Sequence, residues 1–226
     1  MCIMDNGFEN YLIIRSLMLY FTVCYIIDNI LIISTGVKAR WFKLHACYNT
    51  FIVGSTINDV CDILIDPNQG FNEQIQINGL AVLILHIYHC IFFDLKPIDY
   101  YHHGISVFLP IILVPNIKYK FASLYYFNLC GLPGGIDYFG LVFVKYNKMK
   151  KSTQKYYSSL TNAYIRIPLG IVACCFNYIA MANVTDREVY YSLLIMGLII
   201  YTNVVYFGKL SIENYVENKY LTLKQG

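Results

Sequence analysis

Long apolar runs separated by short polar loops extend over almost the whole chain. Runs of about 18 or more apolar residues are typical of transmembrane helices. In lipid, only helices and closed barrels satisfy the backbone, and these runs are too long and too continuous for barrel strands. The pattern therefore predicts an all-α, polytopic membrane protein with about seven transmembrane helices. We expect them at about 11–34, 44–65, 74–93, 98–113, 121–144, 156–181 and 189–207.

The loop charges favour the same topology. With the N-terminus lumenal, the cytosolic loops and C-terminal tail hold twelve lysines and arginines, and the opposite side holds three. This asymmetry follows the positive-inside rule. Adding or removing one span would destroy it. We therefore predict a lumenal N-terminus and a cytosolic C-terminus.

Composition limits the function classes. Hydrophobic residues make up 57% of the chain and charged residues only 14%, whereas soluble domains carry about 25% charged residues. We therefore expect one integral membrane domain in contact with membrane lipids. The net charge of +3 comes from lysines dispersed among short loops, so no nucleic-acid partner is predicted. The eight cysteines form no CxxC pair, which indicates neither a disulfide framework nor a zinc ribbon.

Ionisable and amide side chains recur inside the predicted spans, where they are costly and normally face the bundle interior. In the second span, His45, Asn49, Asp59 and Asp62 fall within roughly 140° of one helix face. Other spans contribute further groups of this kind. The sequence therefore predicts a polar cavity inside the bundle, lined by His45, Asn49, Asp59, Asp62, His86, His89, Asp137 and Arg166.

The segment "DYYHH" places Asp99 three residues before His102 and four before His103. On a helix this spacing lets the carboxylate reach one imidazole, which would fix its tautomer and make its other nitrogen a better base. The pair has three interpretations: packing at the membrane interface, a metal site shared with His86 and His89, or acid–base and nucleophilic chemistry on an amphiphile. The glutamates of di-iron bundles are missing, and we predict no metal.

Three other features keep a structural and a functional interpretation open. Pro133, among three glycines in "CGLPGGID", predicts either a kink or an unwound segment that lines a site. Arg166 is expected to form a structural ion pair with Asp59, Asp62 or Asp137. The lysines of "KYNKMKKSTQK" fit ordinary positive-inside anchoring, or binding of anionic headgroups or of the phosphates of CoA.

The segment "LKPIDYYHHGISVFLP" resembles the signature of TLC-domain membrane proteins, which include the ceramide synthases. "RWFKLHACYNTFIVGS" is similar to the opening helix of that domain, and "TNAYIRIPLGIV" to its arginine helix. The resemblance covers about 40–210. It implies a six-helix bundle around a central cavity, preceded by the helix of residues 1–39 and followed by a cytosolic tail at 211–226.

In ceramide synthases, the resemblance implies transfer of an acyl chain from acyl-CoA to a sphingoid amine, with His102 and His103 as the catalytic pair and Asp99 beside them. The chain departs from that subgroup, because only Asp137 remains of the acidic element before Lys145. It is closer in pattern to short TLC proteins that influence membrane lipid composition. Resemblance alone implies an endoplasmic reticulum location.

Other classes fit less well. A retinal protein needs a lysine deep in a late helix, but Lys209 lies at the edge of the last predicted span. A transporter would explain a broken helix with buried acids, but no inverted repeat supports it. The sequence leaves two functions open: acyltransferase-like chemistry on a lipid, with acyl-CoA as co-substrate and no resident cofactor, or non-catalytic lipid binding.

Overall fold

The chain folds into a helical bundle. The computed structural model describes residues 4–75 and 77–225, and it places the side chains of residues 14–75, 77–100 and 102–220. Helices make up 88% of the structure, and the described residues contain no strand. The all-α prediction is therefore confirmed. Residues 1–3 and 226, at the ends of the predicted N-terminal segment and C-terminal tail, lie outside the described residues.

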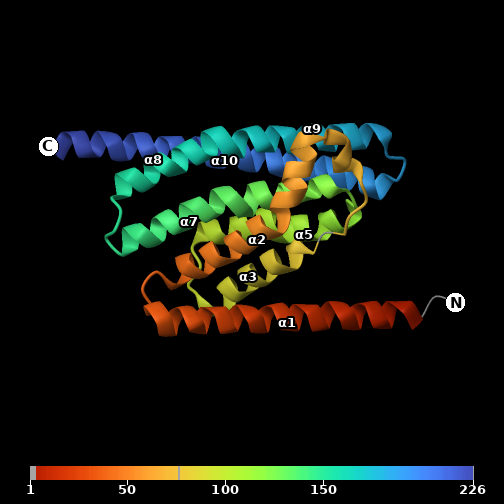
Figure 1. Ribbon diagram of the computed structural model, residues 1–226, viewed down its shortest axis with the longest axis horizontal. Helices are drawn as coiled ribbons and strands as arrows, with labels where there is room; N and C mark the ends of the chain where they lie inside the picture. The colour runs from red at the N-terminus through yellow and green to blue at the C-terminus, as the bar shows by residue number, and fades with distance from the viewer. Residues whose placement is uncertain (1–3, 76, 226) are drawn as a thin grey trace.

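Each predicted span corresponds to one helical rod (Figure 1). The continuous rods are α1 (Met4–Thr35), α2 (Arg40–Ile65), α3 (Asn78–Phe92) and α10 (Arg187–Gln225). In the others, α4 (Pro97–His103) leads into α5 (Leu109–Leu113), α6 (Ser123–Tyr126) into α7 (Leu132–Lys145), and α8 (Lys151–Thr161) into α9 (Ile167–Asn183). Short 3₁₀ turns occupy Pro67–Phe71, Val114–Asn116 and Lys120–Ala122.

Each composite rod is joined by a π-helical segment that a proline follows. The segments are Gly104–Phe108, Phe127–Gly131 and Asn162–Arg166, and the prolines are Pro110, Pro133 and Pro168. Proline donates no N–H, and its ring clashes with the carbonyl four residues earlier. The backbone widens instead to bonds over five residues, such as Leu132 N–H to Phe127 O. The "CGLPGGID" segment is therefore a π-bulged helix and not an unwound one.

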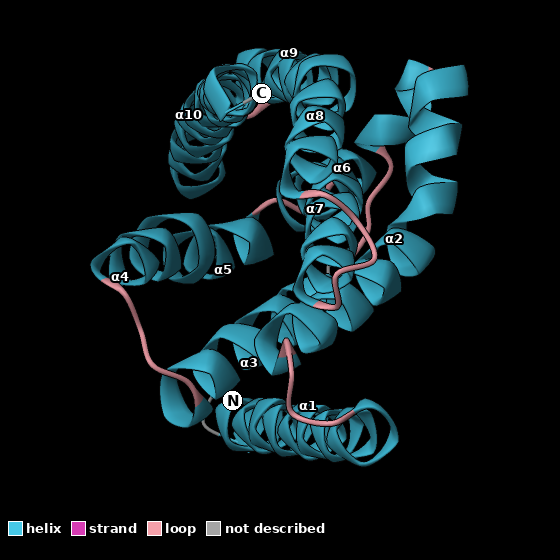
Figure 2. Ribbon diagram, turned by 90° about the vertical axis from the view of Figure 1, so that its left-hand side faces the viewer, coloured by secondary structure: helices cyan, strands magenta, loops and turns pink. Residues whose placement is uncertain are grey.

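The rods are arranged in a ring, seen nearly end-on in Figure 2. Around the ring, α2 packs on α3, α3 on the α4–α5 rod, α5 on α10, α10 on α8 and α9, α8 on α7, and α7 on α2. α1 lies outside the ring, against α2 and α3. Helices distant in sequence thus turn their inner faces toward one another, and this arrangement brings the polar residues of different rods together.

A buried carboxylate attaches α1 to the ring. Asp28 of α1 is fully buried and accepts hydrogen bonds from Arg40 Nε, at 3.0 and 2.9 Å, and from the Tyr88 hydroxyl, at 2.7 Å. Arg40 begins α2 and Tyr88 belongs to α3. A charge buried among apolar helices is tolerated only when it is paired and hydrogen-bonded, and here both neighbours of α1 supply the partners.

Within the part of the chain that the structure describes, four helices are long and apolar enough to cross a membrane: Ile14–Thr35, Lys120–Lys145, Lys151–Asn183 and Arg187–Tyr220. The chain is therefore an integral membrane protein. α3 is shorter, and α2 carries charges at both ends, among them Lys43 and Asp62. The seven-span topology stays a prediction.

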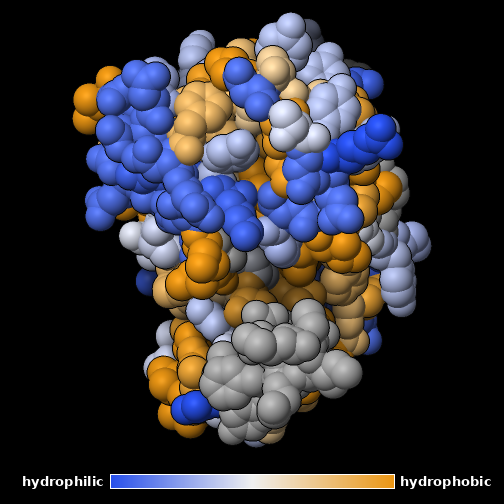
Figure 3. All heavy atoms as spheres, turned by 90° about the vertical axis from the view of Figure 1, so that its right-hand side faces the viewer, coloured by the Kyte–Doolittle hydropathy of each residue, from blue (hydrophilic) through white to orange (hydrophobic). Residues whose placement is uncertain are grey.

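The connections lie at two opposite ends of the ring. At one end, Gln74 N–H donates to Lys118 O at 3.1 Å, and Lys120 N–H to Asn72 O at 2.8 Å. Figure 3 views the end where α9 joins α10, and hydrophilic residues cover much of it. At the other end, the Tyr146 hydroxyl donates to Thr35 O at 2.8 Å and ties the α7–α8 turn to the α1–α2 turn.

The last helix is longer than predicted. α10 does not stop near residue 207 but continues to Gln225, so the described part of the predicted tail at 211–226 is helical. Ser211 is buried, and the Tyr215 ring lies 5.4 Å from the Tyr156 ring of α8. Packing against α8 explains why this polar segment stays helical.

Candidate functional site

All five histidines of the chain gather in one cluster inside the ring. The centroids of the His45 and His86 rings are 5.7 Å apart, and His103 lies 4.9 Å from His86 and 5.1 Å from His89. His102 is 5.9 Å from His103. These residues come from α2, α3 and α4. The structure therefore unites the predicted pair His102–His103 with three of the predicted lining residues.

Hydrogen bonds fix most of the imidazoles. His103 Nε2 lies 3.2 Å from His89 Nδ1, and His103 Nδ1 lies 3.4 Å from Cys90 Sγ. His86 Nδ1 donates to Val82 O at 2.7 Å, and His45 Nδ1 lies 3.2 Å from Asn49 Oδ1. Because the carbonyl of Val82 only accepts, His86 carries its proton on Nδ1 when neutral, and Nε2 is left as an acceptor.

Aromatic rings hold the cluster from several sides. Trp41 stacks on His89 with centroids 3.7 Å apart, and Tyr138 stacks on His45 at 3.8 Å. Phe207 of α10 meets His102 edge-on at 6.0 Å. Such contacts restrict ring rotation and exclude water, so the imidazoles are presented in fixed orientations.

His102 differs from the other histidines. Its Nδ1 is buried and has no hydrogen-bond partner among the described residues. A buried ring nitrogen that finds no protein partner is unusual. No hydrogen bond joins the His102 ring to another described residue, so it is the imidazole of the pair that protein partners leave unfixed.

Asp99 does not form the expected hydrogen bond to an imidazole. Its Oδ2 accepts from the backbone N–H of Lys96 at 2.8 Å, as an acidic residue in the first turn of a helix commonly does. Pro97 begins the helix, and the carboxylate is used to cap it. A role for Asp99 in orienting His102 or His103 stays a prediction.

Asp59 and Asp62 lie far from the histidines. Asp62 accepts from Lys120 Nζ at 2.5 Å, and Asp59 accepts from Gln74 Nε2 at 2.7 Å and Ser123 Oγ at 2.6 Å. Along a helix, the fourteen residues from His45 to Asp59 span about 21 Å. The stripe predicted on α2 therefore divides into a histidine end and an acidic end, and the structure does not bring the two acids into the cluster.

Asp137 and Arg166 lie at the inner faces of α7 and the α8–α9 rod but form no ion pair. Asp137 accepts from Gln154 Nε2 at 2.6 Å. Arg166 donates from Nη2 to Leu129 O at 3.4 Å, and its guanidinium lies 5.4 Å from the Phe207 ring centre. The ion pairs of the described side chains are Arg40–Asp28, Lys120 with Asp59 and Asp62, and Lys209–Glu213. The expected pairing of Arg166 is therefore wrong.

The sequence-based prediction missed several partners in the cluster: Cys90, Trp41, Tyr138 and Phe207. A local signal existed for two of them. Trp41 lies four residues before His45, and Cys90 lies four after His86, so each shares a helix face with a predicted residue. Tyr138 and Phe207 arrive from other rods, and no local pattern identifies them.

The described residues contain no group of three or more histidines, cysteines or acids arranged to hold a metal ion. The hydrogen bonds explain this, because ligand nitrogens must converge on one point. Here both ring nitrogens of His103 face protein partners, Cys90 and His89.

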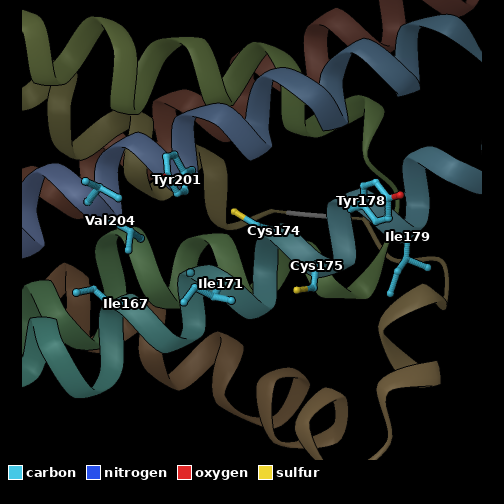
Figure 4. A pocket seen from close by; sticks show the side chains of 10 residues that line it. Ile167, Ile171, Cys174, Cys175, Tyr178, Ile179, Tyr201 and Val204 are labelled. Atoms are coloured by element: carbon cyan, nitrogen blue, oxygen red, sulfur yellow. The ribbon is translucent and has the colours of Figure 1, made fainter.

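Two cavities stand out in the described residues, and both lie away from the histidines. An apolar groove of about 680 Å³ lies between α9 and α10 (Figure 4). Its floor contains the buried residues Gly170 and Val204, and its rim contains exposed Ile171, Tyr178 and Tyr201. A hollow of about 430 Å³ at the α9–α10 turn is lined by Glu73, Lys118 and Asp186 among others. The central cavity stays a prediction.

The polar cluster inside the helical ring is thus defined by its geometry alone. Comparison with protein-family models, curated proteins and solved structures finds no match.

Proposed function

We propose that this integral membrane protein acts in lipid metabolism and that its histidine cluster performs acid–base chemistry on the polar group of a lipid. The observation that carries the proposal is His102, whose buried Nδ1 lacks a protein partner beside four other imidazoles. Acyl transfer is the reaction class that the resemblance to TLC-domain proteins implies.

The hydrogen bonds favour different roles for the adjacent histidines. Both nitrogens of His103 face protein atoms, so this ring is suited to hold its neighbours in place. His102 has the free nitrogen and would accept the proton of an attacking amine or hydroxyl. The new N–acyl or O–acyl bond forms as the bond from the acyl carbon to the thiol of the donor breaks. The proton on His102 then passes to the departing thiolate.

The experiment compares cells that express the wild type, His102→Gln and a control with Cys61→Ser, an exposed residue on the outer surface of α2. Extracts receive labelled acyl-CoA, and the labelled lipids are separated. We expect turnover in the wild type and the control, and a 10²- to 10⁴-fold lower rate in His102→Gln, roughly the contribution of one acid–base group. Turnover that is unchanged in His102→Gln would contradict the proposal.

Non-catalytic lipid binding is the second candidate, and the apolar groove between α9 and α10 favours it. The groove faces outward from two membrane-spanning helices, and its lining side chains are aliphatic, aromatic or cysteine. An acyl chain fits such a surface. This function predicts that the purified chain retains a lipid detectable by mass spectrometry and never consumes labelled acyl-CoA. Turnover that requires His102 would reject it.

For location, we propose an internal membrane such as the endoplasmic reticulum, with the N-terminus lumenal. The proposal rests on the loop charges and on the resemblance.

A further inference from the structure

Arg166 is a buried charge without a counter-ion in contact. Its side chain lies in the π segment Asn162–Arg166, near the middle of the rod Lys151–Asn183, and the residue is only 9% exposed. Its Nε is buried and has no hydrogen-bond partner among the described residues, and Nη2 makes a long bond of 3.4 Å to Leu129 O. An arginine inside a bundle normally faces a carboxylate.

No acid of the described chain fills this role. Asp137 is the carboxylate whose field reaches Arg166, but it forms no ion pair with it and binds Gln154 instead. An isolated charge in a low-dielectric interior is strongly destabilising. Because arginine stays protonated, the charge cannot be relieved by loss of a proton, and an external anion is the simplest means of compensation.

Two neighbouring residues carry polar atoms that have no partner among the described residues. Asn128 is fully buried, and both its amide nitrogen and its amide oxygen lack partners among the described residues. It precedes Leu129, and its Nδ2 lies beside Gly170, one helical turn after Arg166. His102 approaches from α4, and its ring and the guanidinium both contact Phe207. Arg166 and His102 thus share a contact with Phe207, and Asn128 lies next to the residue whose carbonyl Arg166 binds.

We propose that Arg166 and Asn128 bind the anionic headgroup of an acidic amphiphile, a carboxylate or a phosphate, next to His102. The planar guanidinium suits either group, because it can donate two parallel hydrogen bonds. Arg166 lies about 23 Å along the helix from Lys151, a depth that favours a ligand delivered by the membrane over a soluble anion. The inference deepens the proposed function and rests on it for His102, and it assigns the substrate class as an acidic lipid.

The test uses the purified full chain in detergent. Labelled oleate, phosphatidate, oleyl alcohol and inorganic phosphate are the probes, and binding and thermal unfolding are both measured. The variants are Arg166→Gln, Arg166→Lys and Asn128→Ala. The control is Arg15→Gln, which removes an exposed arginine of α1.

We expect oleate or phosphatidate, whichever headgroup the site prefers, to bind the wild type and the Arg15→Gln control and to raise their unfolding temperature. Arg166→Gln should bind at least tenfold more weakly, Arg166→Lys should recover part of the affinity, and Asn128→Ala should lie between them. Without ligand, Arg166→Gln should unfold at a higher temperature than the wild type, because it removes an unpaired charge. That gain also shows that the variant folds.

Three results would overturn the inference: equal affinity for oleyl alcohol, unchanged binding in Arg166→Gln and Asn128→Ala, or inorganic phosphate binding as tightly as the lipids. The assay contains no acyl donor and is therefore independent of turnover. Binding without turnover in the acyl-CoA assay would reject the proposed function and leave this site standing. Turnover with no acidic-lipid binding would do the reverse.

Discussion

The carboxylate of Asp28 shows how strongly one residue can depend on its partners. It is fully buried and bonded to Arg40 and Tyr88. Removing one partner of a buried ion pair leaves an uncompensated charge. We therefore expect Arg40→Gln to lower the free energy of unfolding by about 3–5 kcal/mol. Thermal unfolding of the detergent-purified chain measures the effect.

The control for this prediction is an ion pair at the surface. Lys209 and Glu213 lie 3.6 Å apart with exposed side chains. Since exposed pairs contribute about 0–1 kcal/mol, Lys209→Gln should leave the unfolding temperature nearly unchanged. If both variants unfold at the wild-type temperature, Asp28 does not hold α1 in the way that its contacts indicate.

Gly170 gives a second residue-scale prediction. A Cβ at this position would lie 2.5 Å from Val204 Cγ2 and 3.2 Å from Asn128 Nδ2. Valine is stiff, so Gly170→Ala should destabilise the chain by about 1–3 kcal/mol through overpacking. Adding Val204→Ala should restore most of this loss. Gly54→Ala, which meets no atom within 4 Å in α2, should be neutral or stabilising by about 1 kcal/mol. Equal unfolding temperatures for Gly170→Ala and Gly54→Ala would contradict close α9–α10 packing.

At this scale, the sequence identified which residues carry unusual chemistry better than it identified where those residues lie in the fold. It selected all five histidines and Arg166 because ionisable groups in apolar runs are rare. It also grouped Asp59 with His45, because a helical projection shows angle and omits the distance along the axis. The pairing of Asp59 and Asp62 with Lys120 depends on a loop that returns to α2 from 58 residues away, and no local pattern encodes that.

At the scale of elements, a proline leaves one backbone carbonyl without its helical donor, and a side chain from another rod can then bind that carbonyl. In an α-helix the residue at 133 would donate to Leu129 O, but proline cannot, and Arg166 Nη2 takes this carbonyl. We expect Pro133→Ala to restore the competing donor. Its effect on unfolding free energy should therefore be coupled to that of Arg166→Gln by about 0.5–3 kcal/mol in a double-mutant cycle.

The matched cycle uses Pro110→Ala with Arg166→Gln. Pro110 follows a π segment in a different rod, so the two effects should add to within about 0.5 kcal/mol. If the effects of Pro133→Ala and Arg166→Gln also add, residue 133 and Arg166 do not compete for Leu129 O.

The hydrophobic pattern predicted which segments form helical rods, but it did not predict where the backbone of a rod departs from the α-helix. The expected fourth, fifth and sixth spans are composite rods, and a proline in an apolar run did not indicate whether the helix would kink, unwind or bulge. The last helix also extends beyond the predicted end of its span. The polar residues after 207 stay helical because α8 packs beside them, a contact between elements that periodicity within one element cannot reveal.

At the scale of the whole molecule, the ring arrangement explains why the histidines meet. α2, α3 and α4 are neighbours around the ring, and each carries its histidines near the end where α3 connects to α4 or α1 to α2. The sequence predicted these positions through topology alone, because every second loop in a series of antiparallel helices lies at the same end of the bundle. The inward orientation of each helix depends on its packing with both neighbours.

The loops at the two ends of the ring allow an experiment that distinguishes a topology of seven membrane spans from one of four. If only the four most apolar helices cross, residues 36–119 remain on one side, and the loops at 36–38 and 147–149 face opposite compartments. In the structure, Tyr146 binds Thr35 O and Lys38 O, whereas Asn72 and Lys120 pair at the far end of the ring. We therefore expect epitopes inserted at 37 and 148 to be labelled together, and an epitope at 69 to be labelled only from the opposite side.

Selective permeabilisation of expressing cells makes this measurement, with antibody access to each epitope scored before and after the internal membranes open. Access to 37 and 148 before opening, and to 69 only afterwards, would place the lysine-rich α7–α8 turn in the cytosol. The four-span alternative predicts 37 and 69 on one side and 148 on the other. With the N-terminus lumenal, it would put the five lysines from Lys145 to Lys155 in the lumen, against the positive-inside rule. That result would also separate α2 and α3 from the bilayer, and the histidine cluster could then not be a site inside the membrane.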